Sequence, residues 1–410
     1  MLSRIWLGFF FVSGLAALWR WLARGDAEVF GRLTAALYEM AGLAVEISIG
    51  LIGLLCLWMG LFRIAERAGL VGMLARGLAP LFRRLMPGVP AGHPALGSVT
   101  MNLAANVLGL DNAATPMGLQ AMRDLQRLNP DPGTATDAQI LFLVLNTSSV
   151  TLIPVTVFLF RAQQGSDDPT AVFLPILIAT TASTLAGLFA VAWIQRLRLW
   201  DPVVLAYFGG FALLAAALAS WLSGLGPEAL AARSSLLGNL LIVAVVLGFL
   251  GAGAWRRLDV YAEFVSGARR GLATAVRLIP YLVAMLAAIG ALRASGALEA
   301  AVAAVKALVA AAGLDTAFVP ALPTGLMKPL SGSGARAMLL ETMHAHGVDS
   351  FPATVAAVMQ GSTETTFYVL AVYFGAVGIR NGRHAVACGL IADLAGLLTA
   401  VLVSYAFFTP

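Results

Sequence analysis

Charged residues are scarce in this chain of 410 residues, because only 11% are Asp, Glu, Lys or Arg while 60% are hydrophobic. Soluble domains carry about a quarter of charged residues, so the shortage excludes a soluble globular protein. A membrane-spanning helix needs about 20 mostly apolar residues, and several runs in the sequence reach that length. We therefore expect an all-α polytopic membrane protein.

Cysteine is rare as well. Cys56 and Cys388 lie far apart inside apolar runs, without a neighbouring His or Cys at metal-ligand spacing, which argues against a disulfide framework and a zinc site. The sequence also lacks the motifs of nucleotide-binding loops, serine hydrolases, zinc proteases and thiol oxidoreductases. We expect no enzyme and no cofactor. The net charge of +5 comes from basic clusters beside apolar runs, which indicate membrane topology rather than nucleic-acid binding.

Apolar runs predict about nine membrane spans of about 20 residues, near residues 5–23, 43–62, 138–160, 172–195, 203–223, 235–254, 272–292, 353–377 and 385–408. Two further regions, 95–128 and 316–346, are apolar but interrupted by Gly, Pro, Asn and Ser. Each is predicted to form a re-entrant hairpin of two half-helices, with Pro116 in the first turn of a new helix. Residues 66–85 and 298–312 predict amphipathic helices on the membrane surfaces.

Basic residues indicate the orientation, since cytoplasmic loops carry an excess of Lys and Arg. Arginine clusters follow the second, fourth, sixth and eighth predicted spans. All four clusters fall on one side if the N-terminus is cytoplasmic and the C-terminus lies outside. We expect a multi-pass protein of the bacterial inner membrane in this orientation.

Two polar blocks occur twice. Residues 111–122 align with 332–343 at an offset of 221 positions, and residues 146–151 align with 360–365 at an offset of 214. An odd number of predicted spans separates the copies, so they insert in opposite orientations. Inverted repeats of this kind hold their binding site near the membrane midplane. The predicted fold is an inverted structural repeat with about nine transmembrane helices and two re-entrant helical hairpins.

The duplicated blocks place hydroxyl and amide side chains inside apolar surroundings. Such groups weaken a helix locally and offer ligands to ions or solutes. The alternative is that they bond membrane helices to one another at about 0.6 to 2 kcal/mol per contact. Because they occupy matching places in both copies, we favour a binding site.

Ionisable residues inside a bilayer are expensive and are often functional. Glu364 is the strongest candidate, and Lys328 and Arg336 follow on the opposing hairpin; the alternative is that Glu364 pairs with one of them to hold the fold. Glu46 and Asp393 lie in plain spans and are interpreted as bundle-facing pairs. His344 and His346 are assigned to a solvated turn.

Specific blocks then resemble known families. AVEISIGLIGLLCLWMGLFRIAERAGL, MNLAANVLGLDNAATPMGLQAM and NTSSVTLIP make residues 1–200 similar to spore maturation protein A, and KPLSGSGARAM and QGSTETTFYVLAVYFGAVGI make residues 201–410 similar to spore maturation protein B. This family carries the nucleoside-recognition or Gate domain, shared distantly with concentrative nucleoside transporters and ferrous iron transporter B. The resemblance implies two hairpins and two unwound helices around a substrate, at Asn112, Thr115 and residues 146–151, 331–336 and 360–365.

Together these observations predict a secondary transporter of a small polar or zwitterionic solute, with Na+ or H+ as the coupling ion. The alternative is a non-transporting scaffold for an envelope or spore-maturation complex. The expected partners are the lipid bilayer and a small-molecule solute, without nucleic acid, and a homo-oligomer is compatible with the sequence. The predicted binding residues are Asn106, Asn112, Thr115, Asn146, Thr147, Ser148, Ser149, Thr151, Lys328, Ser331, Ser333, Arg336, Gln360, Ser362, Thr363, Glu364 and Thr365.

Overall fold

A computed structural model describes residues 2–109, 111–148 and 151–410, without the side chains of residues 2, 3 and 111–113. Within these ranges the regular secondary structure is helical, with no strand. Seven of the described helices are long and apolar enough to cross a membrane. They are α1 (Leu2–Arg24), α2 (Glu28–Arg67), α8 (Phe173–Gln195), α9 (Pro202–Leu222), α10 (Pro227–Trp255), α11 (Val260–Ala294) and α17 (Ala385–Phe407). The chain is therefore a multi-pass helical membrane protein.

The remaining helices are shorter. In the first half they are α3 (Leu70–Leu85), α4 (Pro94–Val107), α5 (Asp111–Gln126), α6 (Asp137–Ser148) and α7 (Val155–Gln163). In the second half they are α12 (Ala297–Ala311), η1 (Val319–Ala321), α13 (Leu322–Met327), α14 (Gly332–His346), α15 (Phe351–Ser362) and α16 (Thr366–Ala376). A helix forms in each of the two ranges predicted to be amphipathic, as α3 and α12.

Two of the predicted spans are not continuous helices. The run at 138–160 is divided into α6 and α7, and the run at 353–377 is divided into α15 and α16. Pro154 accounts for the first break, because the residue before a proline avoids the helical conformation. The second break has no proline; Thr363 there is extended, with φ −146° and ψ 172°. The expectation of nine spans thus becomes seven long helices and two broken ones.

The start of α5 also differs from the prediction. This helix begins at Asp111, so Pro116 lies inside it rather than in its first turn. The turn before α5 uses Gly109, whose φ of +71° favours glycine. The chain re-enters the helix directly after this turn, which moves the helix start upstream of the proline.

The order of elements repeats along the chain. A long helix, a surface-type helix, a helix pair, a broken helix and another long helix occur as α2 to α8 and again as α11 to α17. In each copy a glycine with positive φ joins the first two elements, Gly69 at +79° and Gly296 at +80°. The starts of α5 and α14, and the ends of α6 and α15, reproduce the two offsets of the duplicated sequence blocks.

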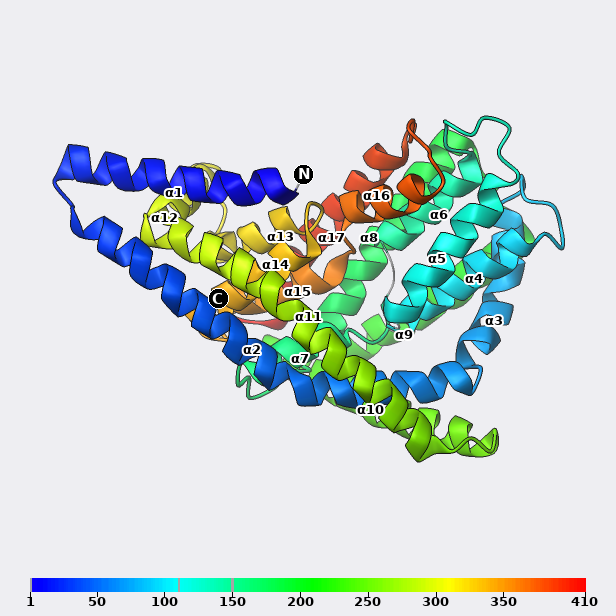
Figure 1. The fold of residues 1–410 in the computed structure, drawn as a ribbon. Helices are drawn as coiled ribbons and strands as arrows, with labels where there is room; N and C mark the ends of the chain where they lie inside the picture. The colour runs from blue at the N-terminus through cyan, green and yellow to red at the C-terminus, as the bar shows by residue number, and fades with distance from the viewer. Residues whose placement is uncertain (1, 110, 149–150) are drawn as a thin grey trace.

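Equivalent helices of the two copies pack side by side. In Figure 1, α2 and α11 lie together with their chain directions opposed. Glycines of α11 allow the two helices to approach closely, because Gly271 faces the backbone of Leu55 and Cys56 and Gly290 faces Met40. The helices α8 and α17 also run antiparallel, because Gly187 faces Ala392 and Gly396 faces Ser183.

The close approach of α2 and α11 leads to a prediction for Gly271→Ala. A Cβ at this position would lie 2.6 Å from the Leu55 carbonyl oxygen and 2.7 Å from the Cys56 Cα. Because backbone must move to admit it, we expect a loss of about 1 to 3 kcal/mol, measured as a lower Tm in detergent. Gly42→Ala in α2 is the matched control, since its Cβ would meet nothing within 4 Å. Equal Tm values for both variants would contradict the packing.

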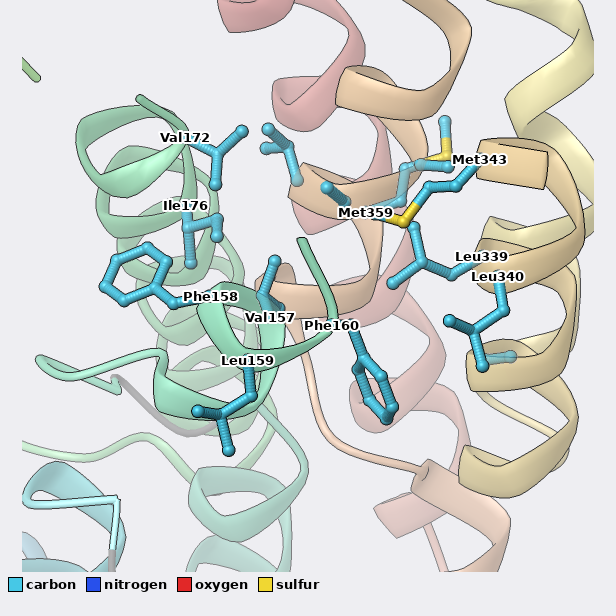
Figure 2. Close-up of a cluster of buried hydrophobic side chains, with 14 of the residues drawn as sticks. Val157, Phe158, Leu159, Phe160, Val172, Ile176, Leu339, Leu340, Met343 and Met359 are labelled. Carbon is cyan, nitrogen blue, oxygen red and sulfur yellow. The ribbon is translucent and has the colours of Figure 1, made fainter. Parts of the chain in front are cut away.

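The apolar core joins the two halves of the sequence. Figure 2 shows Val157, Phe158, Leu159 and Phe160 of α7 between α8 and the helices α14 and α15. On the α8 side lie Val172 and Ile176, and on the other side lie Leu339, Leu340, Met343 and Met359. Burial of these side chains holds the second part of the first broken helix in place.

Candidate functional site

The two helix breaks meet inside the molecule. The Glu364 amide, in the second break, donates a hydrogen bond of 2.7 Å to the carbonyl oxygen of Thr147, at the end of α6. The breaks also bond to the helix pairs: Leu152 N–H donates to Val107 O at 3.1 Å, and Phe367 N–H donates to Pro329 O at 3.0 Å. Backbone groups released by the breaks therefore find partners within the protein, as an interior poor in water requires.

A network of amide side chains supports the first break. Asn106 Nδ2 donates to Asn146 Oδ1 at 2.9 Å, which joins α4 to α6. The Tyr373 hydroxyl of α16 lies 3.4 Å from Asn102 Nδ2 and 3.5 Å from Asn146 Oδ1. Asn106 and Asn146, both predicted as binding residues, are thus engaged in bonding helices to each other.

A polar cavity of about 90 Å³ lies between the breaks. Seven of the predicted binding residues line it, namely Thr151, Lys328, Arg336, Gln360, Thr363, Glu364 and Thr365. Gly109, Gly332 and residues 153–157 complete the wall. Thr156 and its neighbours were not predicted to line the site, because the polar block at residues 146–151 ends before them and only Pro154 marks this stretch.

The cavity brings charges of both signs together. Lys328 is buried and has an interaction partner, whereas Arg336 is half-buried and Glu364 is exposed. Among the described residues no ion pair includes Arg336 or Glu364. Glu364 thus forms no ion pair with Arg336 or Lys328 in the described parts of the chain, although all three residues line the same cavity. A carboxylate and a guanidinium that form no ion pair with the described residues can bind opposite charges of a ligand.

Other predicted binding residues have structural partners or lie away from the cavity. Ser148 donates to the Val144 carbonyl oxygen, Ser331 caps α14 by accepting from Gly334 N–H at 3.0 Å, and Ser362 donates to the Met359 carbonyl oxygen. Thr115, Thr147 and Ser333 do not line the cavity. Ser149 and the side chain of Asn112 lie outside the described residues.

A second cavity, of about 280 Å³, adjoins the polar one. The two share Gly109, Val155, Thr156 and Arg336 in their walls. The larger cavity is mostly apolar and follows α2 from Leu51 to Glu66. Arg63 and Glu66 line its end and are linked by an ion pair of 3.0 Å. Arg336 therefore lies where an apolar passage reaches the polar centre.

Remaining predictions of isolated groups have mixed outcomes. Glu46 is exposed, so the interpretation as a bundle-facing residue is wrong for it. Asp393 faces the bundle as predicted, at 2% exposed, but no ion pair among the described residues includes it. His344 and His346 are exposed in the last turn of α14, as expected of a solvated turn. Partial desolvation and the positive charges of Arg293 and Lys306 lower the pKa of His346. Both cysteines are free.

Comparison with known proteins gives consistent matches. A family model described as nucleoside recognition (Gate) matches residues 48–163 and 275–380, which contain both helix pairs and both broken helices. Spore maturation protein A of Bacillus subtilis (strain 168) is 40% identical over 153 residues, which are 37% of this chain and 78% of that protein. Spore maturation protein B of the same organism is 40% identical over 163 residues, which are 40% of this chain and 90% of that protein. Because these matches cover the chain in two parts, the chain belongs to the Gate nucleoside-recognition family of membrane proteins and is related to spore maturation proteins A and B.

Proposed function

We propose that the protein is a secondary transporter of a small polar or zwitterionic solute. The observation that carries the proposal is the polar cavity, where Arg336 and Glu364 lack ion-pair partners among the described residues and lie beside Lys328 at the meeting of two broken helices. A solute with both an anionic and a cationic group would match these charges. Broken helices around a central site are a recurring arrangement in secondary transporters.

We further propose that residues 1–200 and 201–410 form two inverted halves, and that the pairs α4/α5 and α13/α14 are re-entrant hairpins. Support comes from the repeated order of elements and from the antiparallel packing of α2 with α11 and of α8 with α17. A protein built from inverted halves can adopt two equivalent conformations, each with the central site open to one side of the membrane.

The orientation is part of the same proposal. From the arginine clusters after α2, α8, α10 and α16 we propose that the N-terminus lies in the cytoplasm and the C-terminus outside the bacterial inner membrane. The passage along α2 then extends to the cytoplasmic end at Arg63 and Glu66. We propose that a solute reaches the polar centre along it, driven by Na+ or H+, without a cofactor or a catalytic step.

Uptake into liposomes tests the proposal. Purified protein in liposomes with an imposed Na+ or H+ gradient should concentrate at least one labelled solute from a panel of amino acids, dipeptides and nucleosides. Protein-free liposomes and dissipated gradients are the controls. An absence of gradient-driven uptake across the panel would overturn the transporter proposal and favour the scaffold, which a pull-down of partners in mild detergent would then identify.

A further inference from the structure

A buried carboxylate lies beside the polar cavity, on the helix that follows the second break. Asp393 of α17 is 2% exposed. Its Oδ2 accepts a hydrogen bond of 2.6 Å from the Thr366 hydroxyl, whereas its Oδ1 is buried and has no hydrogen-bond partner. The nearby Thr363 hydroxyl acts on the same carboxylate without forming a hydrogen bond of normal geometry, so Oδ1 is only partly compensated.

Other unpartnered oxygen atoms belong to elements that pack against α17 or adjoin them, namely α6, α8, α15 and the second break. The hydroxyls of Thr147, Ser183 and Thr363 and the amide oxygen of Gln360 are buried and form no hydrogen bond with the described residues. All are oxygen atoms, and all belong to residues at most 6% exposed. Buried polar atoms almost always have a partner, so a group of this size indicates an occupant.

Two glycines of α17 show how closely these groups approach. A Cβ at Gly396 would lie 2.9 Å from Thr363 Cγ2 and 3.1 Å from Ser183 Cβ. A Cβ at Gly389 would lie 2.9 Å from Thr366 Cγ2 and 3.6 Å from Thr147 Cγ2. The segment with Asp393 therefore packs against the end of α6, the middle of α8 and the second break.

The charge of this cluster limits the occupant. Asp393 is its one carboxylate, and Lys328 acts on Asp393 electrostatically without forming an ion pair with it. No group of three or more His, Cys, Asp or Glu suited to a metal occurs in the described parts of the chain. One carboxylate with neutral hydroxyl and amide oxygens suits a hard cation of single charge, whereas divalent ions usually take more carboxylates.

We propose that Asp393 Oδ1, the hydroxyls of Thr147, Ser183 and Thr363 and the amide oxygen of Gln360 form a binding site for one Na+ ion. Gln360 and Thr363 also line the polar cavity. An ion at Asp393 would therefore fix the second break, from which Glu364 reaches the solute. If the protein transports a solute as proposed above, this Na+ ion would be the ion that drives transport. The binding of Na+ itself does not depend on that proposed function.

Thermal unfolding of the purified full chain in detergent tests the site without any solute. At constant ionic strength, NaCl should raise Tm by about 3 to 6 °C relative to choline chloride, as expected for a ligand well above its Kd. The shift should be absent in Asp393→Asn and Thr363→Val and should remain in Thr363→Ser, which keeps the hydroxyl. Ser404→Ala is the matched control, because this buried hydroxyl of α17 bonds only to the Ala400 carbonyl oxygen.

Several outcomes would overturn the site. They are equal Tm values in Na+ and choline, a Na+ shift that survives in both Asp393→Asn and Thr363→Val, and a Tm that follows pH but not Na+, which would indicate a proton or a buried water. If Asp393→Asn fails to fold, the comparison of Thr363→Val with Thr363→Ser decides the result. Na+ binding without any uptake would overturn the transporter proposal alone, and uptake with no Na+ shift would overturn this site alone.

Discussion

Glu364→Gln should lower uptake of the transported solute by at least about tenfold. The substitution keeps the size and hydrogen-bonding shape of the side chain but removes the only carboxylate among the described residues that line the polar cavity. A hydrogen bond to a charged group contributes about 1.5 to 3 kcal/mol, which corresponds to about 10- to 150-fold in affinity. The measurement is the KM and the maximal rate of uptake in liposomes, for the solute identified by the panel.

Glu28→Gln is the control for this variant. Its carboxylate is 92% exposed at the start of α2, distant from the cavity, and makes a contact of 3.8 Å with Arg32. Uptake by this variant should match that of the unmodified protein. Unchanged KM and rate in Glu364→Gln would remove Glu364 from the site and leave Arg336 without an acidic counterpart.

Arg161→Met should destabilise the protein by about 1.5 to 3 kcal/mol, because charged hydrogen bonds are lost while Asp349, 41% exposed, can be hydrated. Arg161 is 2% exposed and forms an ion pair of 2.7 Å with Asp349, in the turn between α14 and α15. It also donates to Ser166 Oγ and to the carbonyl oxygens of Val348 and Asp168. Methionine fills part of the volume but leaves these acceptors without their donor. The measurement is Tm and the midpoint of chemical unfolding in detergent.

Arg127→Met provides the comparison for Arg161. Arg127 is 69% exposed and pairs with Asp124 three residues away, at 3.4 Å. Asp124 is 4% exposed but keeps its hydrogen bonds from Ser98 Oγ and Gln120 Nε2 when Arg127 is replaced, so Tm should fall much less than in Arg161→Met. A small effect at Arg161 would show that the turn at Asp349 is held by the apolar core of Figure 2 rather than by this ion pair.

The membrane class and most helices could be predicted from the sequence, because apolar composition over 20 residues is a local property. The polar blocks at residues 146–151 and 360–365 predicted weak points in two helices, and α6 and α15 end within them, but the length and partners of each break could not be predicted. Both runs are apolar on average, and a break is stable only when distant groups accept the released amides. The bond from Leu152 to Val107 and that from Phe367 to Pro329 are such contacts, and no window of sequence reveals them.

The site was predicted best where charge was the signal. Lys328, Arg336 and Glu364 stand out in apolar surroundings, and all three line the polar cavity. Hydroxyl residues were less informative, because a serine can equally cap a helix, as Ser331 does, or bond to its own backbone, as Ser148 does. Asp393 was predicted to face the bundle, but its environment could not be predicted, since it is assembled from four separate elements.

The contact between the two halves also bears on how the protein is made. The halves are joined at the turn between α8 and α9, where Arg196 adopts a positive φ, while α2 and α11 and α8 and α17 associate through their own surfaces. The covalent link at this turn does not take part in those helix contacts. It fixes the ratio of the two halves at one to one, because a single translation event produces each half once. Assembly therefore does not depend on matched synthesis of two separate polypeptides.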